Sequence, residues 1–158
     1  MDLILWRHAE AELLDFELGP KRDNDRALTP KGRKQAVKMA FWLDSLLPQG
    51  CKILVSPSIR TRQTAMALGR KFTISEDLDT NSKAARVLAA CNWPHSREPV
   101  LIIGHQPYLG DIVTELVDSI GPNCGIRKGN VWWISQKQRE DGDTSFLKAI
   151  MSPELVLK

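Results

Sequence analysis

The chain has 158 residues, of which 42% are hydrophobic and 26% charged, a composition typical of one globular domain. Its 22 basic and 19 acidic residues leave a net charge of +3, too small by itself to indicate nucleic acid or a membrane surface as a partner. The N-terminus lacks a signal-peptide pattern, no apolar run approaches the ~20 residues that cross a bilayer, and the three cysteines form no CxxC pair. We therefore expect a monomeric, cytoplasmic protein.

The first half of the chain alternates strand and helix patterns. The apolar run at residues 3–6 predicts a strand buried on both faces. Apolar residues recur at helical spacing after Pro30, with Thr29 as the N-cap and a stop signal at residues 48–50, so we expect a helix between them. The next two predicted elements are a buried strand at residues 53–55 and a helix at residues 58–71.

The densest basic stretch, residues 31–38, lies within the first of these helices. Its charges interleave with apolar residues at helical spacing and with no aromatic residue. We interpret it as a solvated helix face rather than a nucleic-acid site.

The second half of the chain continues the alternation. A short helix is predicted at about residues 82–91, before a third continuous apolar run at residues 100–103. An apolar stripe after Pro107, ended by Gly121, predicts a further helix.

The tail of the chain predicts a pair of strands, residues 131–136 and 146–151, joined across a polar turn at residues 140–143. Strands that alternate with helices imply right-handed βαβ units. We therefore expect an α/β fold. It should be a three-layer α/β/α sandwich with a mostly parallel central sheet and the strand pair closing one edge.

Two histidines and two arginines follow the ends of the three buried strands. Arg7 and His8 follow the first, Arg60 the second and His105 the third, and ligands of such sheets bind at the carboxyl ends of the strands. Guanidinium groups match the oxygens of a phosphoryl group. A neutral imidazole can act as a nucleophile, and a second one can donate a hydrogen bond. These four residues predict a site for an anion.

Four sequence motifs occur in order along nearly the whole chain: Arg7-His8-Ala9, Leu28-Thr29-Pro30-Lys31-Gly32, Ser56-Pro57-Ser58-Ile59-Arg60 and Gly104-His105-Gln106-Pro107. Together they resemble the signature of the histidine phosphatase superfamily, which includes phosphoglycerate mutases and acid phosphatases. The alanine after His8, the short chain and the last motif are most similar to the compact SixA-type phosphohistidine phosphatases. The resemblance implies one domain of this type over residues 1–158.

The resemblance also implies a role for each matching residue. His8 would be the nucleophile that becomes phosphorylated, while Arg7, Arg60 and His105 would bind the phosphoryl group and stabilise its transition state, with no metal or other cofactor. The implied substrate is phosphohistidine on a phosphotransfer protein, with a small phosphomonoester as the alternative. A non-catalytic module that binds phosphate would carry the same four residues.

Larger members of the superfamily carry an acidic residue that protonates the leaving oxygen. The corresponding stretch here offers Asp79 first and Asp77 second. Alternatively both are solvated loop acids, with Asp79 capping the next helix. Imidazole, with a pKa of about 6.5, leaves more readily than an alkoxide, so the lack of a clear acid favours phosphohistidine. The larger members also carry insertions in the region that corresponds to residues 72–99. The shortness of this region here implies an open pocket that could receive a side chain on a protein surface.

Two other enzyme classes have partial matches in the sequence. Cys91 and Arg97 match the CxxxxxR spacing of cysteine-dependent phosphatases, but the segment follows a predicted helix and contains Pro94, which has no N–H for a phosphate loop. His8, Glu10, His105 and a further acidic residue could hold a metal ion, but the neighbouring arginines would repel a divalent cation.

Overall fold

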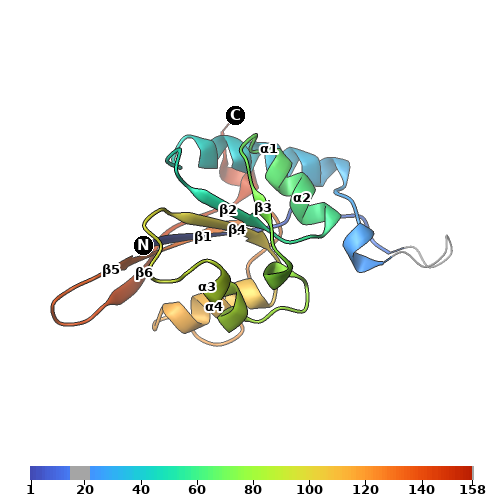
Figure 1. Cartoon of the computed structure of the whole chain (residues 1–158). Helices are drawn as coiled ribbons and strands as arrows, with labels where there is room; N and C mark the ends of the chain where they lie inside the picture. The colour runs from blue at the N-terminus through green and yellow to red at the C-terminus, as the bar shows by residue number, and fades with distance from the viewer. Residues whose placement is uncertain (15–21, 158) are drawn as a thin grey trace.

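A six-stranded sheet in the order β3-β2-β4-β1-β5-β6 runs through the computed structural model, which describes residues 1–14 and 22–157 (Figure 1). The strands are β1 (Asp2–Arg7), β2 (Lys52–Val55), β3 (Thr73–Ile74), β4 (Val100–Gly104), β5 (Val131–Lys137) and β6 (Thr144–Met151). The α-helices of the described residues are α1 (Pro30–Asp44), α2 (Ile59–Met66), α3 (Ala84–Ala90) and α4 (Tyr108–Leu116).

The sheet is parallel from β3 to β1 and antiparallel beyond it. β1 pairs in parallel with β4, β4 with β2, and β2 with β3. β5 then runs antiparallel to β1, and β6 antiparallel to β5. The expectation of a mostly parallel sheet whose edge is closed by a strand pair is confirmed.

Helices cover both faces of the sheet: α1 and α2 pack on one face, α3 and α4 on the other (Figure 1). Successive side chains of a strand point to opposite faces, so β1 contributes to two cores. Leu3 and Leu5 pack with residues of α3 and α4, whereas Ile4 and Trp6 pack with residues of α1 and α2. A strand buried on both faces must be continuously apolar, which explains why its pattern does not alternate.

The start of α1 matches its sequence signals. Thr29 Oγ1 accepts a hydrogen bond from the Gly32 amide at 2.9 Å, and Pro30 is the first helical residue. A Cβ atom on Gly32 would overlap the carbonyl oxygen of Glu10, so this glycine lets the segment after β1 lie directly against the helix. The cap and the glycine therefore hold α1 beside the end of β1.

The predicted helix over residues 58–71 is too long. α2 ends at Met66, and Gly69 adopts a left-handed φ of +69°, a conformation that ends helices and favours glycine. The chain then turns back to form β3, a strand of two residues beside β2. A strand of two residues shows no periodicity, so β3 is not among the elements predicted from the sequence.

None of the described helices is long and apolar enough to cross a membrane.

Candidate active site

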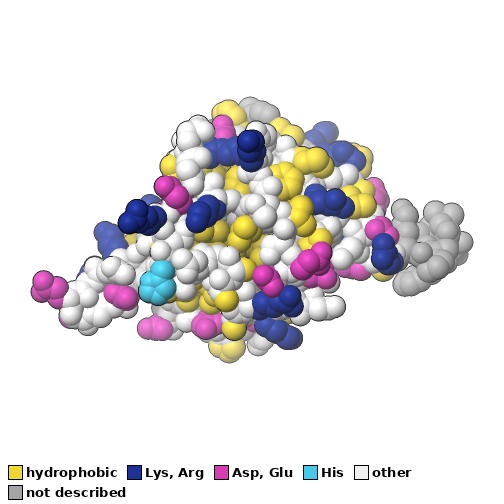
Figure 2. Space-filling model, in the orientation of Figure 1, with side chains coloured by type: hydrophobic (Ala, Val, Ile, Leu, Met, Phe, Trp, Pro, Cys, Tyr) yellow, Lys and Arg dark blue, Asp and Glu magenta, His cyan; other side chains and the backbone are white. Residues whose placement is uncertain are grey.

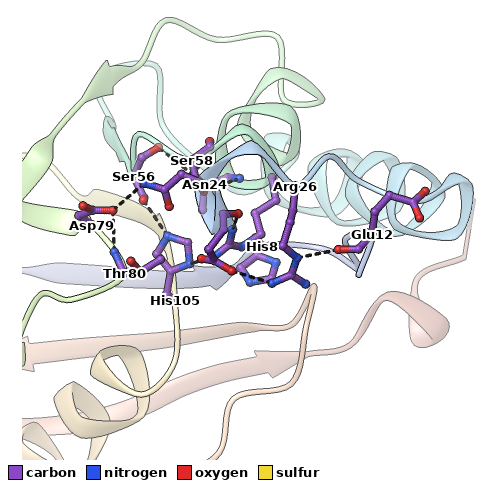
Figure 3. Close-up of polar contacts among 12 residues, drawn as sticks. His8, Glu12, Asn24, Arg26, Ser56, Ser58, Asp79, Thr80 and His105 are labelled. Carbon is purple, nitrogen blue, oxygen red and sulfur yellow. Dashed lines mark hydrogen bonds and ion pairs between the residues drawn. The ribbon is translucent and has the colours of Figure 1, made fainter. Parts of the chain in front are cut away.

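The strand ends bring the four predicted residues together. His8 follows β1 and His105 follows the neighbouring β4, and their ring centroids are 5.4 Å apart (Figure 3). Arg60 lies in the first turn of α2, with its Nη2 3.3 Å from His105 Nδ1. Arg7 is the last residue of β1 and lines the same pocket as the other three.

We call this the central pocket; its volume is about 360 Å³. The described residues that line it are Arg7, His8, Asp23, Arg26, Arg60, Thr80, His105, Gln106 and Lys128. Four of these side chains are cationic and one is a carboxylate, so the pocket is electrostatically suited to an anion.

His8 is held as a neutral imidazole with one defined tautomer. Its Nδ1 lies 2.8 Å from the Ala9 carbonyl oxygen, which can only accept a hydrogen bond, so Nδ1 carries the proton and Nε2 keeps its lone pair. Burial lowers the pKa of His8 to about 3, helped by the nearby charges of His105 and the arginines, although the bond to Ala9 opposes the shift. At neutral pH this ring is therefore uncharged, with the lone pair of Nε2 free.

His105 is also neutral, and Ser56 fixes its orientation. A guanidinium can only donate, so His105 Nδ1 accepts from Arg60, and Nε2–H donates to Ser56 Oγ at 2.7 Å. Burial and then the charge of Arg60 lower the pKa of His105 to about 3, while Asp23 and Asp79 oppose the shift. Ser56 was part of a sequence motif, but its hydrogen bond to His105 was not predicted.

Both arginines keep one buried donor unused. Arg7 Nη1 donates to the Ile126 carbonyl at 2.8 Å, and Arg60 donates through Nη1 and Nη2 to the backbone carbonyl and the carboxylate of Asp23 at 2.8 and 2.9 Å. The buried Nε groups of Arg7 and Arg60 have no partner among the described residues. Burial and the charge of Arg60 also hold the pKa of Arg7 below its usual value. Unpaired buried donors are rare and costly.

Asp23 is one of the pocket residues that the sequence did not predict, together with Arg26, Thr80 and Lys128. It lies in the 3₁₀ turn η2 (Asp23–Asp25), and its carboxylate pairs with Arg26 at 3.0 Å and with Arg60 at 2.9 Å. Burial raises the pKa of Asp23, but hydrogen bonds from the two arginines outweigh it and hold the pKa below its usual value. The one sequence signal is that two acidic residues lie between two arginines in residues 22–26, which does not identify Arg60 as a partner.

The two acids proposed from sequence lie outside the central pocket. The Asp79 carboxylate accepts from Asn24 Nδ2 at 3.2 Å and from the Thr80 amide at 2.8 Å (Figure 3). The idea that Asp79 caps the next helix is wrong, because α3 begins after Lys83 without a side-chain cap. Asp77 pairs with Arg86 Nε at 2.7 Å.

The cysteine and metal alternatives gain no support from the geometry. Cys91 is buried, burial raises the pKa of its thiol to about 11, and its Sγ donates to the Leu88 carbonyl. The Glu10 carboxylate accepts from Thr29 Oγ1 at 2.7 Å. Nowhere in the described part of the chain do three His, Cys, Asp or Glu side chains gather as a metal site requires.

Comparison with known proteins gives one consistent family. The sequence profile of the histidine phosphatase superfamily (branch 1) matches residues 3–83. A phosphohistidine phosphatase SixA homologue from Haemophilus influenzae is 31% identical over 137 residues, which cover 77% of this chain and 80% of the relative.

Two solved structures extend the match to nearly the full length. A structure assigned as a phosphohistidine phosphatase SixA, from Nakamurella multipartitia, is 26% identical with a TM-score of 0.75, covering 96% of this chain and 95% of the other. A protein histidine phosphatase SixA complexed with tungstate is 25% identical with a TM-score of 0.73, and 97% of each chain is covered. Given the profile match and the relative above 30% identity, this chain belongs to the histidine phosphatase superfamily and is a phosphatase of the SixA type.

Proposed function

We propose that the protein hydrolyses phosphohistidine on a partner protein by way of a phosphorylated His8. The observation that carries this proposal is the neutral, buried His8 in one pocket with the guanidinium groups of Arg7 and Arg60. A nucleophile and cationic donors in one pocket are what phosphoryl transfer requires.

In the first step, the lone pair of His8 Nε2 attacks phosphorus and the bond from phosphorus to the substrate imidazole breaks. The substrate ring leaves as neutral imidazole when its other nitrogen carries a proton. In the second step, water attacks phosphorus and the His8–phosphorus bond breaks, releasing phosphate and a proton. The Ala9 carbonyl keeps a proton on His8 Nδ1 throughout, so His8 also leaves as a neutral ring.

The surrounding residues stabilise the charge on the phosphoryl group. Arg7 and Arg60 line the central pocket and would donate through their guanidinium groups. The negative charge of the phosphoryl group would raise the pKa of His105 toward its usual range. A proton gained at Nδ1 would replace the hydrogen bond from Arg60 Nη2, which also donates to Asp23, and Nδ1–H would then donate to the phosphoryl group. With four cationic side chains in the central pocket, the reaction needs no metal ion for charge neutralisation, and a divalent cation would be repelled.

The absence of a proton donor suited to an alkoxide favours phosphohistidine as the substrate. Asp23 is the one acidic residue among those described as lining the central pocket, and its arginine partners keep it ionised. An imidazole leaving group does not need such an acid. The relatives named as phosphohistidine phosphatases, and the one complexed with tungstate, a phosphate-like oxyanion, support the same substrate class.

The test compares kcat/KM on a phosphohistidine carrier protein with kcat/KM on a panel of sugar phosphates and nucleotides. We expect the carrier protein to be preferred. A small metabolite hydrolysed at ~10⁴ M⁻¹s⁻¹ or faster, with no activity on the carrier, would overturn the substrate assignment.

The nucleophile is tested by trapping the enzyme with a labelled phosphodonor. Wild-type protein should carry an acid-labile, alkali-stable label that His8→Ala lacks. His95→Ala is the matched control, because His95 is exposed and lies outside the central pocket. Label retained in His8→Ala would exclude His8 as the nucleophile.

A further inference from the structure

A second cavity, of about 650 Å³, adjoins the central pocket and shares Arg7 and Lys128 with it. We call it the basic groove; it lies between α1, the loop before β5 and the 3₁₀ turn η4 (Pro153–Leu155). Its cationic residues are Arg7, Lys31, Lys34, Lys38, Arg127 and Lys128. We propose that this groove binds the acidic surface around the phosphohistidine of the partner protein, an inference that rests on the proposed function.

The basic groove is formed by one face of α1. Lys31, Lys34 and Lys38 are spaced three and four residues apart and therefore lie on the same side of the helix. The solvated basic face expected from sequence thus borders a cavity. Arg33 lies in the same stretch but is exposed and does not line the groove. On the molecular face drawn in Figure 2, acidic and basic side chains are interspersed, whereas the groove is predominantly of one sign.

The positive charge of the groove is not neutralised within the described residues. None of the lysines of α1, nor Arg127 or Lys128, forms an ion pair in that part of the chain. Of the two carboxylates that line the groove, Glu10 accepts a hydrogen bond from Thr29 and Glu154 is exposed. The groove therefore keeps an excess of positive charge.

The position of Lys31 opposes the stability of α1. The first turn of a helix favours negative charge, yet the first turn of α1 contains no acidic residue and includes Lys31. The partial positive charge of the helix terminus adds to that of the lysines. This arrangement disfavours the isolated helix but strengthens its attraction for an anion, which supports a binding role.

The side chains favour carboxylates spread over a protein surface. Lysine ammonium groups are point charges on flexible stems, so the three lysines along α1 can meet carboxylates at varied positions on a partner surface. Because Arg7 and Lys128 border both cavities, a partner whose phosphohistidine enters the central pocket would place neighbouring acidic residues in the groove. Such charge complementarity speeds association and weakens with salt.

The experiment compares a double charge reversal in the groove, Lys34→Glu with Lys38→Glu, with a matched one outside it, Arg33→Glu with Lys52→Glu. Both pairs change the net charge equally, and Arg33 and Lys52 are exposed and do not line the groove. Each protein is assayed on a carrier whose phosphohistidine is surrounded by carboxylates and on phosphoramidate, a small phosphodonor.

The groove variant should lose at least tenfold in kcat/KM on the carrier, mainly through KM, and less than threefold on phosphoramidate. Its activity on the carrier should also depend less on ionic strength. The control pair should stay within twofold of wild type on both substrates. Equal losses on the two substrates, or equal losses in groove and control variants, would overturn the inference.

A third substrate separates a protein surface from a second phosphate. If the groove variant loses activity on a bisphosphorylated small molecule but not on the carrier, the groove is a phosphate subsite and our assignment of a protein partner is wrong. In each of these outcomes wild-type protein still hydrolyses the carrier. Failure of wild type on phosphohistidine would instead overturn the proposed function.

Discussion

Replacing Arg60 by Ala should lower kcat/KM at least 100-fold. The side chain is only 4% exposed, Asp23 and His105 hold its terminal nitrogens, and its buried Nε has no partner among the described residues. A positioned donor that stabilises charge in the transition state contributes about 3 to 4 kcal/mol, which corresponds to roughly 10² to 10³ in rate. Arg60→Ala removes this donor and leaves Asp23 with Arg26 as its one remaining cationic partner among the described residues.

The assay is steady-state hydrolysis of phosphoramidate and of the phosphohistidine carrier, with Arg62→Ala as the control. Arg62 lies two residues further along α2, is exposed and does not line the central pocket, so its loss should change kcat/KM by less than twofold. Arg60→Lys retains the charge but not the fork and should recover only part of the rate. Thermal unfolding establishes that each variant folds. If Arg60→Ala and Arg62→Ala behave alike, the placement of Arg60 in the site is refuted.

Three further predictions concern protonation, positioning and packing. NMR of the ring nitrogens should find His8 and His105 neutral from pH 8 down to pH 5, and a titration midpoint near pH 6.5 for either ring would contradict this. Because the folded state resists protonation of these rings, the free energy of unfolding should fall as the pH drops from about 6.5 toward 3. Ser56→Ala removes the acceptor of the His105 Nε2–H and should lower kcat about tenfold with little change in KM, because an unpaired buried donor costs about 1–3 kcal/mol and the ring is then free to turn. An unchanged kcat would exclude a positioning role for Ser56. Gly32→Ala should destabilise the protein by about 1–3 kcal/mol in chemical denaturation, since its Cβ overlaps the Glu10 carbonyl, and wild-type stability would show that α1 can shift without cost.

The longer strands of the sheet, the start of α1 and the convergent residues could be predicted from the sequence, whereas β3 could not. Strands buried on both faces must be continuously apolar, so the runs at residues 3–6 and 100–103 could be recognised without knowing their neighbours. Thr29 and Pro30 act on the adjacent backbone, so their effect is also local. The side chains after parallel strands meet because those strands end at one edge, which placed His8 beside His105 before any distance was known.

How these residues are paired and protonated depends on contacts between distant segments of the folded chain. Asp23 reaches Arg60 across 37 residues of sequence, and Ser56 reaches His105 across 49, by contacts that no local pattern encodes. The neutral state of His8 depends on burial and on charges from three separate segments of the chain. The basic groove also depends on the folded chain. The helical spacing of its lysines is visible in the sequence, but the cavity exists because α1 packs beside η4 and the loop before β5.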